Sequence, residues 1–468
     1  MSHSSKARIH LLVLAVFAPL ILAVTLLVGL SGLGAQESAH DHQDHDHGAA
    51  SGHDHALRLN QDPDLASRLV GPQDEEVSTQ AAPVPGDFTT GGFTSNNVEY
   101  VGFLPFEKGS GEPVPGQPQE IVSSTGANIR GDFMYLTGWK SISIYNISDP
   151  LNPKLTAYKP VGFMFENENV ATNGRIMLFS ESLPGNALHV YDVSDKTQIR
   201  EIATVQGAGD HTTTCILGCR WAYGSDGSII DLRDPRNPRL MRQNWHRLTG
   251  LNADGAHDVD EYKPGFLVTS PISDDFQVLD VRDPLNPKVI GRGKHPQPED
   301  FLFHSGTWPR AGEDKFVLMQ GEMNFKTRCD RGQGPVMTYD KVEGTSRFAL
   351  KDRYRVENGT YVDGAPAINV LGCSAHWFEV HPTWKNGGLM ALGYYEHGTH
   401  FLKVAGDGDI RRVGYFLPHA GSTSAAYWLN RRVVYAIDYT RGIDILRYTG
   451  LGTDGPLTGA NQNGAGRG

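Results

Sequence analysis

The chain has 468 residues, enough for two or three average domains or one large all-β domain. Its 42 basic and 53 acidic residues give a net charge of −11, which argues against a nucleic-acid backbone as a partner. With 54 glycines and 27 prolines, turns must be frequent, and this favours many short strands over long helices.

The N-terminal segment, residues 1–35, is predicted to anchor the chain in a membrane. After Lys6 and Arg8, the stretch from Leu11 to Ala35 contains no charged residue. It is longer than the roughly 20 residues that span a bilayer and longer than a typical signal-peptide core. Basic residues precede it and none immediately follows, so we expect the rest of the chain to be extracytoplasmic. Cleavage near Ala35, which would release a secreted protein, is the alternative.

Residues 36–90 have the composition of a flexible, disordered linker. Within them lies "HDHQDHDHGAASGHDH", in which imidazole and carboxylate groups are crowded together. Such a segment binds transition-metal ions without a preformed cage. Its histidines are His40, His42, His45, His47, His53 and His55.

A repeat begins beyond this linker. Three stretches share one plan, an alternating apolar strand followed by Asp-Pro-x-Asn-Pro and a second strand: "ISIYNISDPLNPKL" from Ile142, "SIIDLRDPRNPRL" from Ser228 and "FQVLDVRDPLNPKV" from Phe276. Asp-Pro opens a tight turn, and the second proline cannot donate a ladder hydrogen bond. Less regular copies start at Leu188 and Phe401.

A repeat of about 40–50 residues is typical of a β-propeller. We count seven units, at approximately 118–163, 164–209, 210–255, 256–302, 303–374, 375–418 and 419–449. The last unit, ending in "GIDILRY" at Gly442, lacks its outer strand, and "NNVEYVGFLPF" near Asn96 has the character to supply it. The sequence therefore predicts an all-β, seven-bladed β-propeller over residues 91–450, followed by a disordered tail at 451–468. An open sandwich or two smaller domains are the alternatives.

The Asp-Val-x-Asp-Pro-x-x-Pro turn after an alternating strand resembles the LVIVD-repeat family of exported β-propellers. The resemblance covers roughly residues 120–450 and is clearest in three blades. It implies a propeller fold and an extracytoplasmic location, and little about chemistry. More distantly, the chain is similar to the selenium-binding protein and methanethiol oxidase group, whose functional residues we do not transfer.

The four cysteines suit an exported chain. Cys329 and Cys373 are predicted to form a disulfide that pins an insertion in the fifth blade. Cys215 and Cys219 flank a tight hairpin and are the second expected pair. Four buried thiols are the alternative.

Histidines recur where successive innermost strands begin. They are His211, His257, His304, His376 and His419. Three of the four intervals are 43 to 47 residues, and the interval of 72 includes extra residues between Met323 and Ala375. Innermost strands of a propeller line its central channel, so these positions predict a ring of imidazoles that bind Cu, Zn or Fe. Ordinary channel histidines are the alternative.

Several further residues are candidates for the same site. Asp258 and Glu166 could orient imidazole rings, and Glu322 ends a strand that could reach them. The others are His381, His397 and His400, for which the same channel mouth and the outer surface both remain open.

Two function classes remain open from the sequence. In the first, the ring holds a metal with an open coordination position, and the protein is a metal-dependent oxidoreductase or hydrolase. In the second, the propeller is a non-catalytic cell-surface protein that buffers metal or binds a protein partner. The chain has no nucleophile elbow, phosphate loop or His-Glu-x-x-His pair, which favours metal chemistry over the common hydrolase mechanisms.

Overall fold

The protein is described from a computed structural model and is all-β, with several small antiparallel sheets. The described residues are 77–78, 92–105, 124–138, 141–161, 167–181, 186–252, 254–296, 301–322, 334–356, 374–418, 421–439, 442–450 and 452. Within these ranges no helix is long and apolar enough to cross a membrane. The expected anchor (Leu11–Ala35), the histidines of the linker and the tail after residue 452 lie outside them.

Most strands form units in which each strand pairs with the next strand along the chain. The first three units contain β4 (Ser124–Arg130), β5 (Phe133–Gly138), β6 (Ser141–Asn146) and β7 (Lys154–Pro160); β8 (Ile176–Glu181), β9 (Ala187–Asp192) and β10 (Arg200–Gln206); and β11 (Thr213–Ile216), β12 (Trp221–Gly224), β13 (Ile229–Asp231) and β14 (Arg239–Leu240). The next two contain β15 (Ala256–Lys263), β16 (Phe266–Pro271), β17 (Phe276–Asp280) and β18 (Lys288–Gly293); and β19 (Leu302–Thr307), β20 (Phe316–Glu322), β21 (Val336–Lys341) and β22 (Arg347–Tyr354). Parallel pairing of β18 with β22 joins these two units into one eight-stranded sheet.

The sixth and seventh units include strands from the N-terminal part of the described chain. The sixth contains β23 (Phe378–Val380), β24 (Gly388–Gly393), β25 (Thr399–Val404) and β26 (Ile410–Pro418), extended by β2 (Gly92–Ser95) and β1 (Val77–Ser78). The seventh contains β27 (Thr423–Trp428), β28 (Val433–Asp438), β29 (Gly442–Tyr448) and β3 (Val98–Pro105). Two short helices, α4 (Trp245–Thr249) and α5 (Pro309–Gly312), lie between strands.

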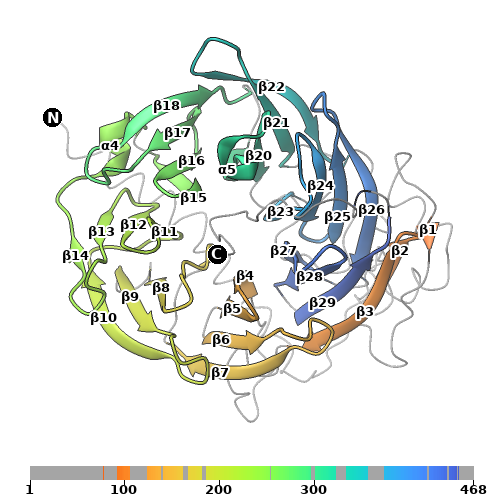
Figure 1. Cartoon of the computed structure of the whole chain (residues 1–468), viewed down its shortest axis with the longest axis horizontal. Coiled ribbons are helices and arrows are strands. Elements are labelled where there is room, and N and C mark those ends of the chain that lie inside the picture. The colour runs from red at the N-terminus through yellow and green to blue at the C-terminus, as the bar shows by residue number, and fades with distance from the viewer. Residues whose placement is uncertain are drawn as a thin grey trace, which may run out of the picture.

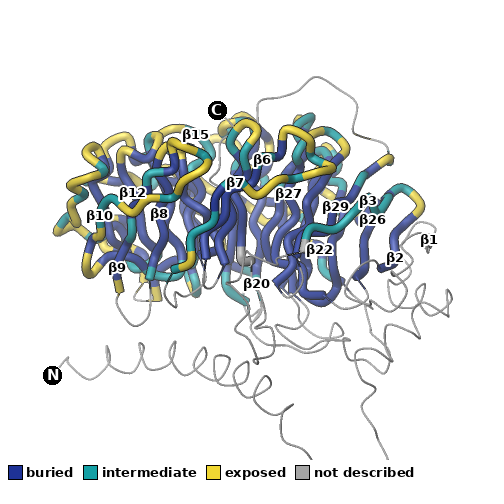
Figure 2. Tube along the Cα trace, turned by 90° about the horizontal axis from the view of Figure 1, so that it is seen from below, coloured by how far each residue is buried: buried dark blue, intermediate teal, exposed yellow. Residues whose placement is uncertain are grey.

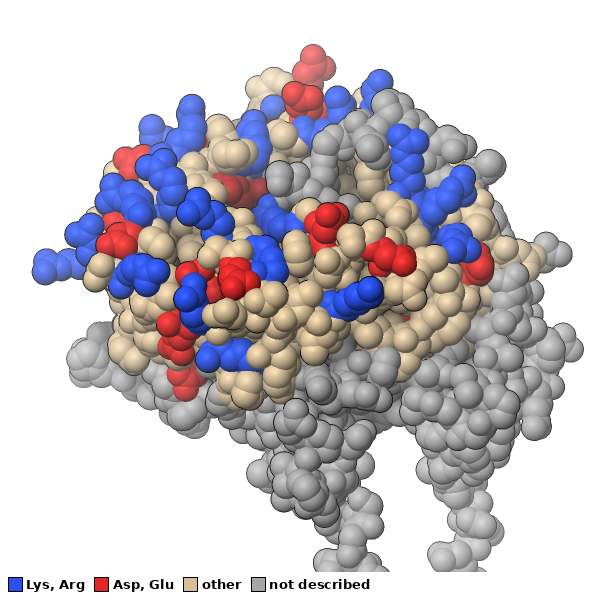
Figure 3. All heavy atoms as spheres, turned by 60° about the horizontal axis from the view of Figure 1, so that its bottom comes forward, with Lys and Arg blue, Asp and Glu red and all other residues tan. Residues whose placement is uncertain are grey.

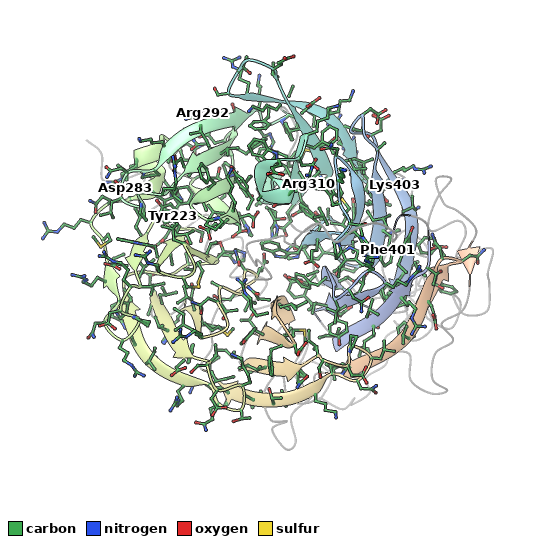
Figure 4. The ribbon with its side chains drawn as sticks, viewed as in Figure 1. Tyr223, Asp283, Arg292, Arg310, Phe401 and Lys403 are labelled. Carbon is green, nitrogen blue, oxygen red and sulfur yellow. A yellow bond between two sulfur atoms is a disulfide. The ribbon has the colours of Figure 1, made fainter. Side chains whose placement is uncertain are left out.

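The units stand side by side around a central axis (Figure 1). The strand cores are buried, and the exposed residues gather at the turns and outer strands (Figure 2). Apolar side chains of neighbouring units pack between the sheets: Phe401 of β25, labelled in Figure 4, shares a buried cluster with Val434 of β28 and Leu446 of β29. Burial between the sheets is therefore what holds each unit against the next.

The Asp-Pro-x-Asn-Pro turns have the same hydrogen bonds in all three copies. In the first, the Asp149 carboxylate accepts from the backbone N–H of Leu151 at 3.1 Å and from the side-chain amide of Asn152 at 2.8 Å. The corresponding pairs of bonds are made by Asp234 and Asp283. The aspartate thus folds the turn through its side chain, which is why the motif needs both Asp and Asn.

Two of these turns also bind the preceding unit. The Tyr223 hydroxyl of β12 donates to the carbonyl of Pro284 at 2.6 Å, and Figure 4 shows Tyr223 beside Asp283 of that turn. The Tyr435 hydroxyl of β28 donates in the same way to the carbonyl of Pro150 at 2.7 Å. At these two positions the repeat motif therefore joins neighbouring sheets by a hydrogen bond near their outer edge.

Charged side chains of both signs cover the face shown in Figure 3. Lys and Arg gather over part of this view, with Asp and Glu interspersed.

The last unit is completed by β3, as the sequence predicted. Strand β3 pairs antiparallel with β29, from Val98 opposite Tyr448 to Pro105 opposite Gly442. The first and last described strands of substantial length are therefore neighbours, and the edge of β29 is covered. Val77 and Ser78, which fall within the expected linker, pair with β2.

One of the two expected disulfides is confirmed. Cys215 and Cys219 are joined across the turn between β11 and β12, with their Cα atoms 4.5 Å apart. Leu217, Gly218 and Cys219 all have positive φ, so the turn is tight enough to bring the two sulfur atoms together. Cys329 and Cys373 lie outside the described residues.

Candidate metal centre

A cluster of histidines and one glutamate occupies the start of successive innermost segments. His257 lies in β15 and His304 in β19, while His211 and His376 come just before β11 and β23. Glu168 lies in the corresponding segment before β8. Five successive units each contribute one of these side chains, so ring topology brings together residues that are far apart in the chain.

The carboxylate of Glu168 lies at the centre of this cluster, and the residue is only 3% exposed. Its Oε2 lies 2.7 Å from Nε2 of His304 and accepts from the indole N–H of Trp377 at 3.1 Å. Its Oε1 lies 3.2 Å from Nε2 of His376 and accepts from the Tyr439 hydroxyl at 3.3 Å. Both carboxylate oxygens are therefore held by polar groups from the fifth, sixth and seventh units.

The third and fourth units complete the set of imidazoles around this carboxylate. Nε2 of His211 lies 3.5 Å from Oε1 of Glu168, and Nε2 of His257 lies 4.0 Å from Oε2. Neighbouring rings contact one another: the centroid distances are 4.4 Å from His211 to His257, 4.0 Å from His257 to His304 and 4.1 Å from His304 to His376. The four rings therefore form a row beside one carboxylate.

Backbone carbonyls determine the tautomer of two of the imidazoles. Nδ1 of His257 lies 3.1 Å from the carbonyl oxygen of His304, and Nδ1 of His376 lies 2.7 Å from that of Ser424. A carbonyl oxygen only accepts, so each Nδ1 must carry the hydrogen. In the neutral ring Nε2 then keeps its lone pair, directed toward Glu168. Nδ1 of His304 is buried and has no hydrogen-bond partner within the described structure.

The electrostatics of the cluster favour an ionised Glu168 carboxylate, with protonation favoured at His376 and disfavoured at His257 and His304. Burial alone would raise the pKa of Glu168, but the nearby His376, His304 and His211 lower it well below its usual value. Burial and the neighbouring rings lower the pKa of His257 well below its usual value. Burial also lowers the pKa of His304. For His376, burial opposes protonation, yet the charge of Glu168 outweighs it and the pKa is raised.

The carboxylate of Glu322 and the hydroxyl of Tyr395 border the cluster. The hydroxyl of Tyr395 donates to Glu322, at the end of β20, and the Tyr395 ring lies 4.7 Å from that of His376. Tyr395 has a φ of 38°, and its backbone N–H and carbonyl both bond to Thr423, at 3.0 and 2.8 Å. Left-handed backbone conformations in bulky residues are costly and concentrate at functional sites. Tyr395 is therefore held in place and keeps Glu322 oriented.

The cluster is more accessible from one side than from the other. The side chains of His304 and His376 are fully buried, whereas those of His211 and His257 are 15% and 10% exposed. Solvent therefore contacts the cluster at His211 and His257, which belong to the third and fourth units.

The residues present fit a transition-metal ion. Three sets of side chains each offer three ligand atoms that lie within 4.8 Å of one another: Glu168 with His304 and His376, Glu168 with His211 and His257, and Glu322 with His257 and His304. Two imidazoles with one carboxylate are the ligands of many catalytic zinc and non-haem iron sites. In the neutral ring of His304, Nε2–H donates to Glu168, so the buried Nδ1, which has no hydrogen-bond partner within the described structure, carries a lone pair that a metal ion could accept.

Four of the five histidines predicted to form a ring are brought together here, while His419 lies outside the described residues, as does Glu166. Asp258 does not orient a histidine through any hydrogen bond in the described structure. Its carboxylate accepts from the side chain of Asn169 at 3.0 Å and from the Thr214 hydroxyl at 3.4 Å, and burial raises its pKa to about 7.

The three remaining candidates lie in the sixth unit and bond elsewhere. Nε2 of His381 lies 2.9 Å from the carbonyl of Arg431, and the His381 ring packs on Trp428. Nε2 of His400 lies 2.9 Å from Nδ1 of His397. Each of these histidines is buried, with hydrogen bonds that account for it as part of the core.

Sequence reasoning missed Glu168 and the aromatic donors. It offered Glu166 for the second unit, two residues before the residue that enters the cluster. The signal was present, because Glu168 precedes His211 by 43 residues, the interval of one unit. Trp377 and Tyr439 give no comparable signal, since each is an ordinary core aromatic by its sequence context.

The comparisons with known proteins find similarity in structure but none to a known family. No protein-family model matches its sequence, and no curated protein matches either. Among solved structures it is similar to a functionally unknown protein from Desulfotomaculum acetoxidans DSM 771, with 10% sequence identity and a TM-score of 0.44. That similarity covers 64% of this chain and 87% of the other.

Proposed function

We propose that the protein is an exported, membrane-anchored β-propeller that binds a divalent transition-metal ion at the centre of its ring. The observation that carries the proposal is the convergence of four imidazole Nε2 atoms, from four successive units, at 2.7 to 4.0 Å from the carboxylate of Glu168. Imidazole with carboxylate suits Zn, Cu or Fe better than the oxygen-bound Ca or Mg.

The hydrogen bond that fixes the tautomer of His257 supports a cation at this position. Nε2 of His257 holds a lone pair and faces an anionic carboxylate, an arrangement that is unfavourable unless a positive charge lies between or beside them. A proton on His376 is favoured by Glu168, but the lowered pKa of His257 leaves that ring neutral. A metal ion satisfies both imidazoles and the carboxylate at once.

The donor set also supports metal-dependent oxidoreduction as the activity. An ion held here, when bound, would supply redox or Lewis-acid chemistry. The chain's own groups have definite roles: Trp377 and Tyr439 hold Glu168 by donated hydrogen bonds, and Tyr395 orients Glu322. The partly exposed His211 and His257 mark the side from which a small substrate could approach.

A non-catalytic role in buffering metal at the cell surface is the second candidate. It is favoured by the linker, where six histidines occur between His40 and His55. Such a segment could collect ions, while the cluster in the ring stores one of them.

The seven-bladed propeller, the export and the membrane anchor are parts of the same proposal. The seven units, their arrangement around one axis and the pairing of β3 with β29 support a closed propeller. The disulfide between Cys215 and Cys219 supports an oxidising compartment. The uncharged stretch from Leu11 to Ala35 supports anchoring. Protease digestion of intact cells should remove the ring but leave the chain's N-terminus membrane-bound.

The test of metal binding uses the full chain with the linker histidines replaced by glutamine, so that only the ring can hold a metal tightly. After loading with Zn²⁺, Cu²⁺ or Fe²⁺ and dialysis, metal analysis should find at least one ion per chain. A chain that retains none would overturn the proposal. As a matched control, His189→Gln, in a histidine held between Glu181 and Glu201 outside the cluster, should retain the ion.

The metal that the protein carries when isolated from its own cells separates the two activities. A copper or iron ion that changes its absorption or EPR spectrum on reduction supports an oxidoreductase. Zinc alone, with no spectral change, supports binding without redox chemistry.

A further inference from the structure

We propose that the cluster holds two metal ions, bridged by the carboxylate of Glu168, rather than one ion shared by four histidines. This inference rests on the proposed metal function and adds the number of ions and the role of each carboxylate.

The first observation is that Glu168 belongs to two separate sets of ligands. One set joins it to His304 and His376, and the other joins it to His211 and His257. Each set supplies two imidazoles and a carboxylate oxygen, all within 4.8 Å of one another. Each is therefore sufficient to bind a divalent ion on its own.

The second observation is that each set contains one imidazole whose tautomer is determined by a backbone carbonyl. His376 in one set donates from Nδ1 to Ser424, and His257 in the other donates from Nδ1 to His304. In each set a neutral ring would therefore direct an Nε2 lone pair toward Glu168. Each set thus contains one imidazole whose Nε2, when it carries no proton, is positioned to bind an ion beside Glu168, and one ion in one set leaves the lone pair of the other unbound.

The third observation is the position of Glu322. Its carboxylate forms a third set with His257 and His304, which belong to different Glu168 sets. Glu322 thus connects the two halves of the cluster, and Tyr395 holds its side chain by a donated hydrogen bond. Two carboxylates that each link two histidine pairs are the ligand pattern of carboxylate-bridged dinuclear centres.

The row of rings is compatible with this spacing. Adjacent imidazole centroids are 4.0 to 4.4 Å apart along His211, His257, His304 and His376. A bridging carboxylate places two ions about 3.5–4 Å apart, which is the separation found in two-metal sites. The two ions would lie beside successive pairs of rings along this row.

The test counts ions in the folded full chain with the six linker histidines replaced by glutamine. Equilibrium dialysis against Zn²⁺ should give two tightly bound ions per chain. One ion leaves the proposed function standing and overturns the two-ion inference, and no ion overturns both. The same protein loaded with Cu²⁺ gives a second measurement that needs no site variant. Two bridged Cu²⁺ ions should show a magnetically coupled EPR spectrum, whereas two independent signals would contradict the bridge.

Variants then show which histidines bind which of the two ions. His211→Ala and His376→Ala should each retain one ion per chain, because each removes a ligand from only one set. Glu168→Gln should lose the magnetic coupling in Cu²⁺-loaded protein. If either histidine variant loses both ions while its circular dichroism matches that of the parent, the histidines share a single ion and the inference is wrong.

Discussion

Nε2 of His304 lies 2.7 Å from Oε2 of Glu168, although 136 residues separate them in the chain. Both side chains are buried, and the contact crosses from the fifth unit to the second. The units stand around one axis (Figure 1), and their innermost segments bring these two side chains together. The contact therefore links the fold to the site, because a change that opens the ring also separates the ligands.

Replacing Glu168 with glutamine should weaken metal binding without unfolding the protein. The amide preserves the size of the side chain but removes the charge and one acceptor, so we expect the dissociation constant for Zn²⁺ to rise at least about tenfold. Isothermal titration of the chain without linker histidines measures this. The matched control is Glu201→Gln, at a carboxylate that pairs with His189 outside the cluster, and its affinity should equal that of the parent.

The contact of β29 with its neighbours should be essential for stability. Leu446 is fully buried and faces Tyr100 of β3 in the strand register. Leu446→Ala should reduce the free energy of unfolding by about 2–5 kcal/mol, through lost burial and the cavity left behind. Leu248→Ala, at a leucine that is 45% exposed, should change it by less than about 1 kcal/mol. Urea denaturation of both variants checks this, and equal losses would contradict it.

The disulfide in the third unit should make a modest contribution. Closing so short a loop restricts the unfolded chain only slightly, and the chain-entropy relation gives about 2 kcal/mol. The double variant Cys215→Ser, Cys219→Ser should lower the free energy of unfolding by that amount in the absence of reductant. Adding reductant to the parent should lower its free energy of unfolding by a similar amount. The variant lacks Cys215 and Cys219, so reductant should have no effect on it through this disulfide.

His246, in α4 outside the cluster, should make stability depend on pH. Burial lowers its pKa from 6.5 to about 4, so between these values the unfolded state binds more protons than the folded state. The stability that the neutral ring provides is complete above about pH 6.5 and is lost as the pH falls toward 4. Relative to His246→Gln, the parent should lose about 3 kcal/mol over that interval. Denaturation of both proteins at pH 7 and pH 4 measures this difference, and parallel pH profiles would show that His246 is not responsible.

Much of the architecture could be predicted from local chemistry. Asp149, Asp234 and Asp283 each fold their turn through bonds to residues two and three positions ahead, so the motif reveals the turn without any knowledge of the fold. The alternating strands around these turns gave the unit length. That length in turn placed His211, His257, His304 and His376 at equivalent positions.

The centre of the site depended on tertiary structure. Glu168 was missed because an uncertainty of one or two residues in where an innermost segment begins changes which residue occupies the position that faces the axis. Trp377 and Tyr439 reach Glu168 from the sixth and seventh units, and nothing in their local sequence indicates a polar partner.

The sequence by itself therefore determined the repeated strands and turns and the interval at which histidines recur, because these depend on interactions over a few residues. Tertiary structure alone decided which side chains meet. The seventh unit, completed by β3 beside β29, bonds to the first unit through the Tyr435 hydroxyl and the Pro150 carbonyl. This arrangement of the units around one axis brings Nε2 of His304 and His376 to a carboxylate from the second unit. Contacts across an axis depend on every intervening sheet, so no local pattern encodes them.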